Sequence, residues 1–189
     1  MASVCASCFY WLRQLRRVRR SLDSASVKTL VHAFVTARVN YCNTVLAGAP
    51  KSVTDRLQQV MNAAARQVSG MHMFDHGLSQ LLHGDLHWLD VADRVKYKLG
   101  ATVHRCLHNK APQYLADCCV AVSELTGRQR LRSAQRRQLD VPRYQRSTFG
   151  RRAFSVARPT VWNSLLDELR NATDKAFSRL LKTFLFSQY

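Results

Sequence analysis

The acidic side chains of this chain lack the spacing that metal-dependent chemistry on phosphates requires. Polymerases and nucleases hold divalent cations with two or more carboxylates that lie close together. No two aspartates are adjacent in the sequence. The nearest acid clusters are Asp85, Asp90 and Asp93, and Asp167 with Glu168. The first cluster falls at a predicted helix start, where acids are expected as caps, so we predict no catalytic residue.

Histidine and cysteine residues occur at spacings that only partly match metal sites. Three histidine pairs have the i,i+4 spacing that can clamp zinc from one face of a helix. These pairs are His72/His76, His83/His87 and His104/His108. None contains the glutamate of a HExxH zinc peptidase, and Cys106 would point away from the last pair on a helix. Cys5-x-x-Cys8 lacks a second pair at zinc-finger spacing. We therefore expect ordinary surface or core roles for these side chains and predict no metal and no cofactor.

Positive charge is the strongest chemical signal in the sequence. The 189 residues contain 29 Lys and Arg against 12 Asp and Glu, which gives a formal net charge of +17. Such an excess points to a polyanionic partner, most often a nucleic acid and sometimes an anionic membrane surface. A basic surface that is merely solvated is the alternative. Because the sequence has no glycine-rich phosphate-binding loop and no nucleophile elbow, we predict binding rather than catalysis.

The first concentration of charge lies on an amphipathic helix that we predict from Cys8 to Leu22. Apolar residues keep helical spacing on one side of this helix. The other side carries Arg13, Arg16, Arg17 and Arg20. Five arginines precede the first acid, Asp23. We interpret the arginine face as a candidate contact with nucleic-acid phosphates, and the sequence supports a solvated helix face equally well.

The second concentration lies between Arg128 and Arg158, where the chain has ten arginines, no lysine and one acid. Arginine rather than lysine favours bidentate phosphate contacts or stacking on bases. Tyr144, Phe149 and Phe154 are interleaved as candidate stacking platforms. Short runs at residues 139–143 and 153–157 predict a small antiparallel ribbon. A flexible basic tail is the alternative.

Helical periodicity dominates the rest of the chain. It predicts helices at residues 24–48, 52–69, 91–109, 114–122 and 174–186. The fold should be mainly α: a helical bundle of four to six helices, with a small β-ribbon in the Arg-rich C-terminal segment. We expect four segments, which are a basic amphipathic helix (1–22), a helical domain (24–122), an Arg-rich segment with short strands (123–160) and a C-terminal helical segment (161–189).

The helix predicted from Ser24 to Gly48 is apolar around most of its circumference. Its non-apolar residues form one narrow stripe, made of Thr29, His32, Thr36, Asn40 and Asn43. This pattern is typical of a helix enclosed by other helices, here capped by Ser24 and ended by Gly48. The next helix should begin at a Ser52 cap and pack back on it as an antiparallel hairpin. Arg38 falls among apolar residues, so we expect it to pair with an acid or a backbone carbonyl in preference to nucleic acid.

The six cysteines are too few and too irregular for a disulfide scaffold, so we interpret them as reduced thiols. No apolar run approaches the length that spans a bilayer, and the arginine-rich N-terminus lacks the apolar segment of a secretory signal. We therefore expect the cytoplasm, the nucleus or both, with no membrane partner. An N-terminus of this composition also imitates a mitochondrial transit peptide.

Ordered motifs along nearly the whole chain resemble one protein family. The motifs of the first half are Leu15-Arg16-Arg17-Val18-Arg19, Leu30-Val31-His32-Ala33-Phe34-Val35 with Arg38, Tyr41-Cys42-Asn43, Leu57-Gln58-Gln59-Val60-Met61-Asn62-Ala63-Ala64-Ala65-Arg66 and Leu86-His87-Trp88-Leu89. Those of the second half are Leu107-His108, Ala111-Pro112, Tyr114-Leu115, Leu131-Arg132-Ser133, Val141-Pro142-Arg143, Phe149-Gly150, Arg152-Ala153-Phe154-Ser155-Val156-Ala157 and Pro159 with Trp162-Asn163-Ser164-Leu165. The chain looks like the C-terminal part, thumb and post-thumb, of the reverse transcriptase polyprotein of LINE-type (non-LTR) retrotransposons, in the jockey-like and chicken-repeat-like group.

This resemblance implies a place in a polymerase rather than a reaction. Residues 24–122 would form a thumb-like domain, and the fingers and palm with their metal-binding aspartates, like the endonuclease, would precede Met1. By the resemblance, the chain is a truncated fragment of an RNA-directed DNA polymerase that retains contacts with RNA or DNA backbones. The candidate contacts are Arg16, Arg17 and Arg20 of the first helix and Arg143, Arg151 and Arg152 near the C-terminus. Asp90 and Leu166 stand where the family pattern has proline, which hints at a decaying genomic copy. The alternative is a non-catalytic helical protein-interaction domain, or a relic without a partner.

Overall fold

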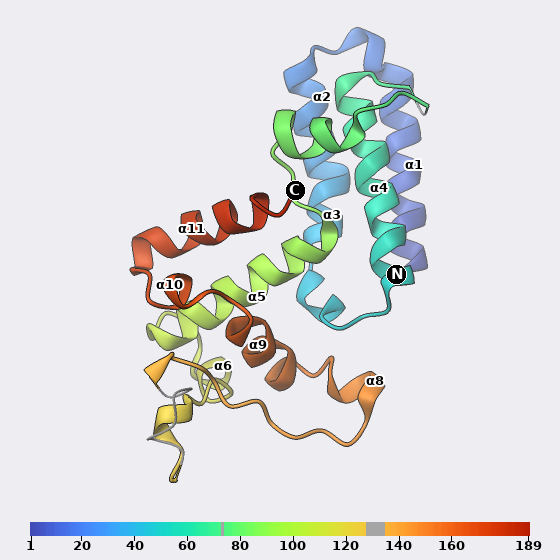
Figure 1. Ribbon diagram of the computed structural model, residues 1–189. Helices are drawn as coiled ribbons and strands as arrows, with labels where there is room; N and C mark the ends of the chain where they lie inside the picture. Colours follow the sequence, from blue (N-terminus) through green and yellow to red (C-terminus); the bar gives the residue numbers. More distant parts are fainter. Residues whose placement is uncertain (73, 128–134) are drawn as a thin grey trace. The chain divides into compact units, whose positions relative to one another are not determined.

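The computed structural model describes residues 1–72, 74–127 and 135–189 and is mainly helical, as the sequence predicts (Figure 1). The chain forms two compact units. The first unit contains Met1–Asn43 and Ala49–Arg94, and the second contains Thr44–Gly48 and Val95–Tyr189. The boundary between the two units thus falls within the helix that begins at Val91. The sequence analysis instead placed a segment boundary between residues 122 and 123. Arg128, Arg130 and Arg132 of the Arg-rich segment, and the Leu131-Arg132-Ser133 motif, lie outside the described residues.

The first unit is built from long helices that bury one another's apolar faces. They are α1 (Ala2–Val18), α2 (Ser24–Val31), α3 (Ala37–Asn40) and α4 (Lys51–Ser69), with a 3-10 turn η1 (Arg19–Ser21) and π-helical turns η2 (His32–Thr36) and η4 (Gln80–Asp85). Figure 1 shows α1, α2 and α4 side by side. Their contact faces form a core of Cys8, Leu12, Leu15, Val27, Val31, Val35, Leu57, Val60, Met61, Ala64 and Ala65. Trp11 of α1 stacks on Phe34, with ring centroids 4.5 Å apart.

The capping residue of α2 and the first residue of α4 each differ by one residue from the sequence prediction. Asp23 rather than Ser24 caps α2, because its carboxylate accepts hydrogen bonds from the backbone N–H groups of Ala25 and Ser26. A hydrogen bond with the Ser26 side chain, together with these backbone hydrogen bonds, lowers the pKa of Asp23. The predicted Ser52 cap is wrong: α4 begins at Lys51 after Pro50 and has no side-chain cap. Gly70 ends α4 in the left-handed conformation (φ 81°), as predicted.

The helix predicted from Ser24 to Gly48 is shorter and less regular than its periodicity suggested. It ends at Asn40, and the π turn η2 interrupts it. A π turn adds a residue to one turn, so side chains beyond it rotate to a different face. Of the predicted polar stripe, Thr29 and His32 are exposed, whereas Thr36 and Asn43 are buried.

The second unit contains the continuation of α5 (Val91–Leu107) and several shorter helices. They are α6 (Gln113–Ala116), α8 (Ser147–Gly150), α9 (Phe154–Asn163), α10 (Asp167–Arg170) and α11 (Asp174–Phe186), together with the 3-10 turn η5 (Val122–Glu124). The start and end predicted for α11 are confirmed, whereas α6 is shorter than the predicted helix 114–122. The core consists of Leu99, Val103, Val156, Trp162, Leu165, Phe177, Leu181 and Leu185. Gly100 of α5 allows Leu181 of α11 to approach closely, because a Cβ at position 100 would lie 3.1 Å from a methyl group of Leu181.

The predicted β-ribbon is not formed by the residues that the structure describes. Residues 154–157 begin α9, and Leu139 makes only an isolated antiparallel bridge with Ala121. The side-chain amide of Asn163 explains this difference. Asn163 Oδ1 accepts from the Leu139 N–H at 2.9 Å, and its Nδ2 donates to the Leu139 carbonyl at 2.8 Å. The amide therefore occupies the backbone groups that a second strand would have paired.

Candidate nucleic-acid interface

Four of the predicted arginines lie on one solvent-facing side of the first unit. Arg13, Arg16, Arg17 and Arg20 are exposed, and their spacing of three, four and seven residues places them along one face. None of them makes an ion pair with any residue that the structure describes. Because α1 contains no acidic residue, its positive charge is not neutralised locally. The face can therefore attract phosphate groups.

Arg19, in the same cluster, has a structural role instead. Its guanidinium donates to the backbone carbonyls of Gln67 at 3.1 Å and Val68 at 3.3 Å. These carbonyls belong to the last turn of α4, where the helix dipole favours a positive charge. Arg19 thus ties the end of α1 to the end of α4.

Arg38 does not have the partner that its apolar surroundings suggested. It is exposed and donates to the hydroxyl of Ser7 at 3.0 Å, so a hydroxyl takes the place of the expected acid or backbone carbonyl. The end of α3 two residues later explains its exposure. The hydrogen bond joins α1 to α3.

The predicted arginines of the second unit lie in the segment from residue 141 to residue 152. Arg143 and Arg151 are exposed, and Arg152 is half-buried and donates to the Val45 carbonyl at 3.4 Å. The segment is folded back on itself, because a Cβ at Gly150 would lie 2.7 Å from the Cβ of Tyr144. Only glycine permits this approach. The turn holds Arg143 and Arg151 on the surface without an ion pair among the described residues.

The three candidate aromatic platforms differ in their availability. Phe149 is 70% exposed and Tyr144 is 43% exposed, so both rings are open to a stacking partner. Phe154 is already used inside the protein. Its ring lies 3.7 Å from the guanidinium of Arg158.

Two arginines are buried among the residues that the structure describes. Arg158 belongs to the segment predicted to bind a polyanion, and Arg170 had no role predicted from the sequence. Arg158 is fully buried and donates to the carbonyls of Leu115 at 2.9 Å and Phe154 at 3.2 Å. Arg170 donates to three backbone carbonyls and to Asp167. No signal in the sequence separates them from surface arginines, because each also bonds to a backbone carbonyl far away in the chain, that of Leu115 for Arg158 and that of Arg136 for Arg170.

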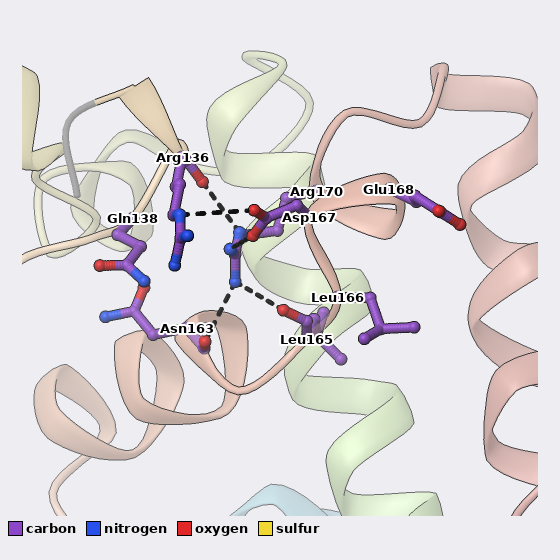
Figure 2. A pocket seen from close by; sticks show the side chains of 8 residues that line it. All are labelled: Arg136, Gln138, Asn163, Leu165, Leu166, Asp167, Glu168 and Arg170. Atoms are coloured by element: carbon purple, nitrogen blue, oxygen red, sulfur yellow. Dashed lines mark hydrogen bonds and ion pairs between the residues drawn. The ribbon is translucent and has the colours of Figure 1, made fainter. Parts of the chain in front are cut away.

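Arg170 is one of the residues that line a pocket of about 470 Å³, and Figure 2 shows its guanidinium bonded to other lining residues. The pocket is lined by Arg136, Gln138, Asn163, Leu165, Leu166, Asp167, Glu168 and Arg170. Asp167 also pairs with Arg136, whose Nε lies 3.5 Å from Oδ2, and Figure 2 shows Glu168 pointing away from this cluster. The polar groups at the centre are bonded to one another, and we assign this cluster a structural role.

Asp90, in the acid cluster at residues 85–93, directly precedes α5 and bonds with a side chain of α4. Asp90 Oδ1 accepts from Gln58 Nε2 at 2.8 Å, and Gln58 Oε1 accepts from the Val91 N–H at 2.9 Å. Gln58 therefore links α4 to the start of α5. Burial raises the pKa of Asp90, and the nearby His83 opposes this effect.

A cluster of polar side chains in the second unit joins α5 to α11. His104 is 3% exposed, and its ring is stacked between His108 and Phe177, each with a centroid distance of 4.1 Å. Asp174 lies beside it and pairs with Lys110. Burial, together with electrostatic interactions with His108 and Lys110, lowers the pKa of His104 to about 4, so the His104 ring is neutral at neutral pH.

Comparisons with known proteins identify no family for this chain. No family model, no curated protein and no solved structure matches it. Among the described residues, no helix combines the length and apolar character that crossing a membrane requires. By sequence, the first unit has 11 Lys and Arg against 6 Asp and Glu, and the second has 18 against 6. The positive charge is thus carried by both units and is greater in the second.

Proposed function

We propose that this chain is a C-terminal fragment of a LINE-type retrotransposon reverse transcriptase that binds RNA or DNA through phosphate contacts and does no chemistry itself. Support for the family comes from the ordered sequence motifs, which span nearly all of the chain. The observation that carries the binding function is the arginine face formed by Arg13, Arg16 and Arg17 of α1 and Arg20 of η1. Its four side chains are exposed, and none is paired with an acid among the described residues.

The arginine face suits a nucleic-acid backbone better than a particular base sequence. Arg13 and Arg20 are seven residues apart, or about 10 Å along the helix, so the face can contact several phosphates. In the second unit, Arg143 and Arg151 add phosphate contacts, and Phe149 adds a ring on which an unpaired base can stack. Such contacts depend on charge and shape and not on base edges.

The proposal is tested by fluorescence anisotropy with a labelled RNA hairpin and with an RNA–DNA hybrid of equal length, over a series of salt concentrations. We expect binding at low salt and a steep fall in the association constant as salt is raised. Replacing Arg13, Arg16, Arg17 and Arg20 by glutamine should make the slope of log K against log salt shallower by about 0.7 to 0.9 for each phosphate that the variant no longer neutralises.

A charge-matched variant separates a specific face from general attraction. Lys28, Lys51, Arg56 and Arg179 are exposed cations that lie off this face of α1, and their replacement by glutamine lowers the net charge by the same amount. We expect this control to keep most of the salt slope. Equal slopes in both variants would remove the arginine face from the mechanism. Absence of binding at low salt would favour the other class, a helical interaction domain or a relic without a partner.

A further inference from the structure

The cluster around His104 brings close together three side chains that carry possible metal-ligand atoms. His104 and His108 come from α5 and the residue after it, and Asp174 begins α11. Ligand atoms of these three residues all lie within 4.8 Å of one another. We propose that His104, His108 and Asp174 form a binding site for one divalent transition-metal ion such as Zn²⁺. This inference is independent of the proposed nucleic-acid binding.

The separation between His104 and Asp174 fits a shared metal ion better than a direct contact. His104 Nδ1 lies 3.6 Å from Asp174 Oδ1, which exceeds the usual hydrogen-bond length. A tetrahedral zinc ion with bonds of about 2.0–2.1 Å holds its ligand atoms about 3.3–3.4 Å apart. A small inward movement of the carboxylate, which is 34% exposed, therefore brings both atoms to coordinating distance.

His108 is prepared to act as the third ligand. Its Nδ1 lies 2.8 Å from the backbone carbonyl of His104, an arrangement that places the ring proton on Nδ1 and leaves the Nε2 lone pair available. Metal-bound histidines commonly have such a carbonyl partner. The rings of His104 and His108 are stacked at an interplanar angle of 26°, so their in-plane lone pairs do not yet meet. His108 is exposed and can turn, whereas His104 is enclosed and fixes the position of the site.

Lys110 competes with a metal ion for the same carboxylate. Its ammonium pairs with Asp174, and the lysine side chain is 57% exposed. A metal ion at the site replaces this positive charge, and the flexible lysine moves into solvent. Two histidines and one carboxylate leave a coordination position for water, as in an open zinc site. Among the described residues, His104 Nε2 has no hydrogen-bond partner, which weakens the site because second-shell bonds strengthen metal affinity.

The site is tested by titrating the full chain with Co²⁺, followed by the visible absorption of the bound ion, and then by displacement with Zn²⁺. The exposed cysteines Cys42 and Cys118 are alkylated beforehand so that thiol binding does not contribute. We expect one equivalent of Co²⁺ to bind with a tetrahedral spectrum that lacks sulfur charge-transfer bands. Replacing the exposed His108 by alanine should weaken binding by at least about tenfold while the circular dichroism spectrum is unchanged.

Removing the competing lysine gives a result that a purely structural cluster would not produce. Lys110→Ala should bind Co²⁺ several-fold more tightly than the unaltered protein, because Asp174 is released. Arg179→Ala removes an equal charge from α11 and should leave the affinity unchanged, and His32→Ala removes an exposed histidine elsewhere with the same result. Equal Co²⁺ binding by the unaltered protein and His108→Ala would overturn the site, as would weaker binding in Lys110→Ala.

Discussion

Arginine residues in this chain serve two opposite purposes that depend on what surrounds each guanidinium. Arg16 and Arg17 extend into solvent from a helix without acids. Arg170 is 3% exposed, and it bonds with the carbonyls of Arg136 at 2.9 Å, Asn163 at 3.0 Å and Leu165 at 2.6 Å. A buried guanidinium is tolerated because its planar array of donors satisfies several acceptors at once.

Arg170→Lys should therefore be strongly destabilising although the charge is retained. A lysine ammonium cannot reach the same set of carbonyls, and each buried acceptor left unpaired costs about 1–3 kcal/mol. We expect the free energy of unfolding, measured by urea denaturation, to fall by about 2–4 kcal/mol. Arg179→Lys, an exposed site on α11, is the control and should lie within about 0.5 kcal/mol of the unaltered protein. A similarly small effect at Arg170 would show that its hydrogen bonds contribute little.

At the scale of the element, the rod formed by α2, η2 and α3 shows how one irregular turn changes which side chains are buried. Uniform helical spacing places Thr29 and Thr36 on the same polar stripe. Thr29 is exposed, and its hydroxyl donates to the Ala25 carbonyl at 3.0 Å. Thr36 is 2% exposed, and its hydroxyl has no hydrogen-bond partner in the part of the chain that the structure describes. In the π turn, the His32 carbonyl accepts a hydrogen bond from the Ala37 N–H. In an α-helix, the donor would be the residue before Ala37.

Thr36→Val should consequently stabilise the protein. Valine has the shape of threonine without the hydroxyl, so the substitution removes an unsatisfied buried group at little cost in packing. We expect the free energy of unfolding to rise by about 1 kcal/mol, which thermal denaturation detects as a higher Tm. Thr29→Val is the matched control on the same rod and should give no gain, because its hydroxyl is already bonded. A loss of stability in Thr36→Val would indicate that the hydroxyl has a partner in solution.

At the scale of the whole molecule, each unit has its own core, and the cysteines are divided between the two. Cys5 and Cys8 are buried in the first unit, and Cys106 and Cys119 are buried in the second. Burial raises the pKa of the Cys119 thiol to about 12, although the positive charge of Arg158 opposes this effect. Burial likewise raises the pKa of Cys8. A thiol with a raised pKa is a poor nucleophile at neutral pH.

Alkylation with iodoacetamide at pH 8, followed by mass spectrometry, tests which cysteines are buried in the native protein. Only Cys42 and Cys118 are exposed, so the native protein should incorporate two labels quickly and the remainder slowly. Cys118 and Cys119 are neighbours in the sequence and provide an internal comparison. All six cysteines should react in guanidinium chloride. Equal labelling rates for Cys118 and Cys119 in the native protein would contradict the burial of Cys119.

Local periodicity was sufficient to predict the mainly α fold and several element ends. The spacing of Leu12 and Leu15 predicts the buried side of α1, and the conformational freedom of Gly70 predicts the end of α4. The same spacing predicts that Arg13 and Arg16 face solvent, as they do in the structure. These features depend on residues within a few turns of one another, and such residues are neighbours in the sequence.

Contacts between residues that are distant in the sequence determined the features that periodicity did not predict. Asn163 occupies the backbone of Leu139 in place of the predicted ribbon, and Arg170 bonds to the carbonyl of Arg136, a residue far from it in the chain. The cluster of His104 and His108 acquires its carboxylate from Asp174, about 70 residues later. The sequence alone determined the helices, the basic charge and the motifs that resemble a retrotransposon polymerase. Only the tertiary structure separated the arginines that can reach a partner from those that hold the fold, because packing between segments determines which charges are desolvated.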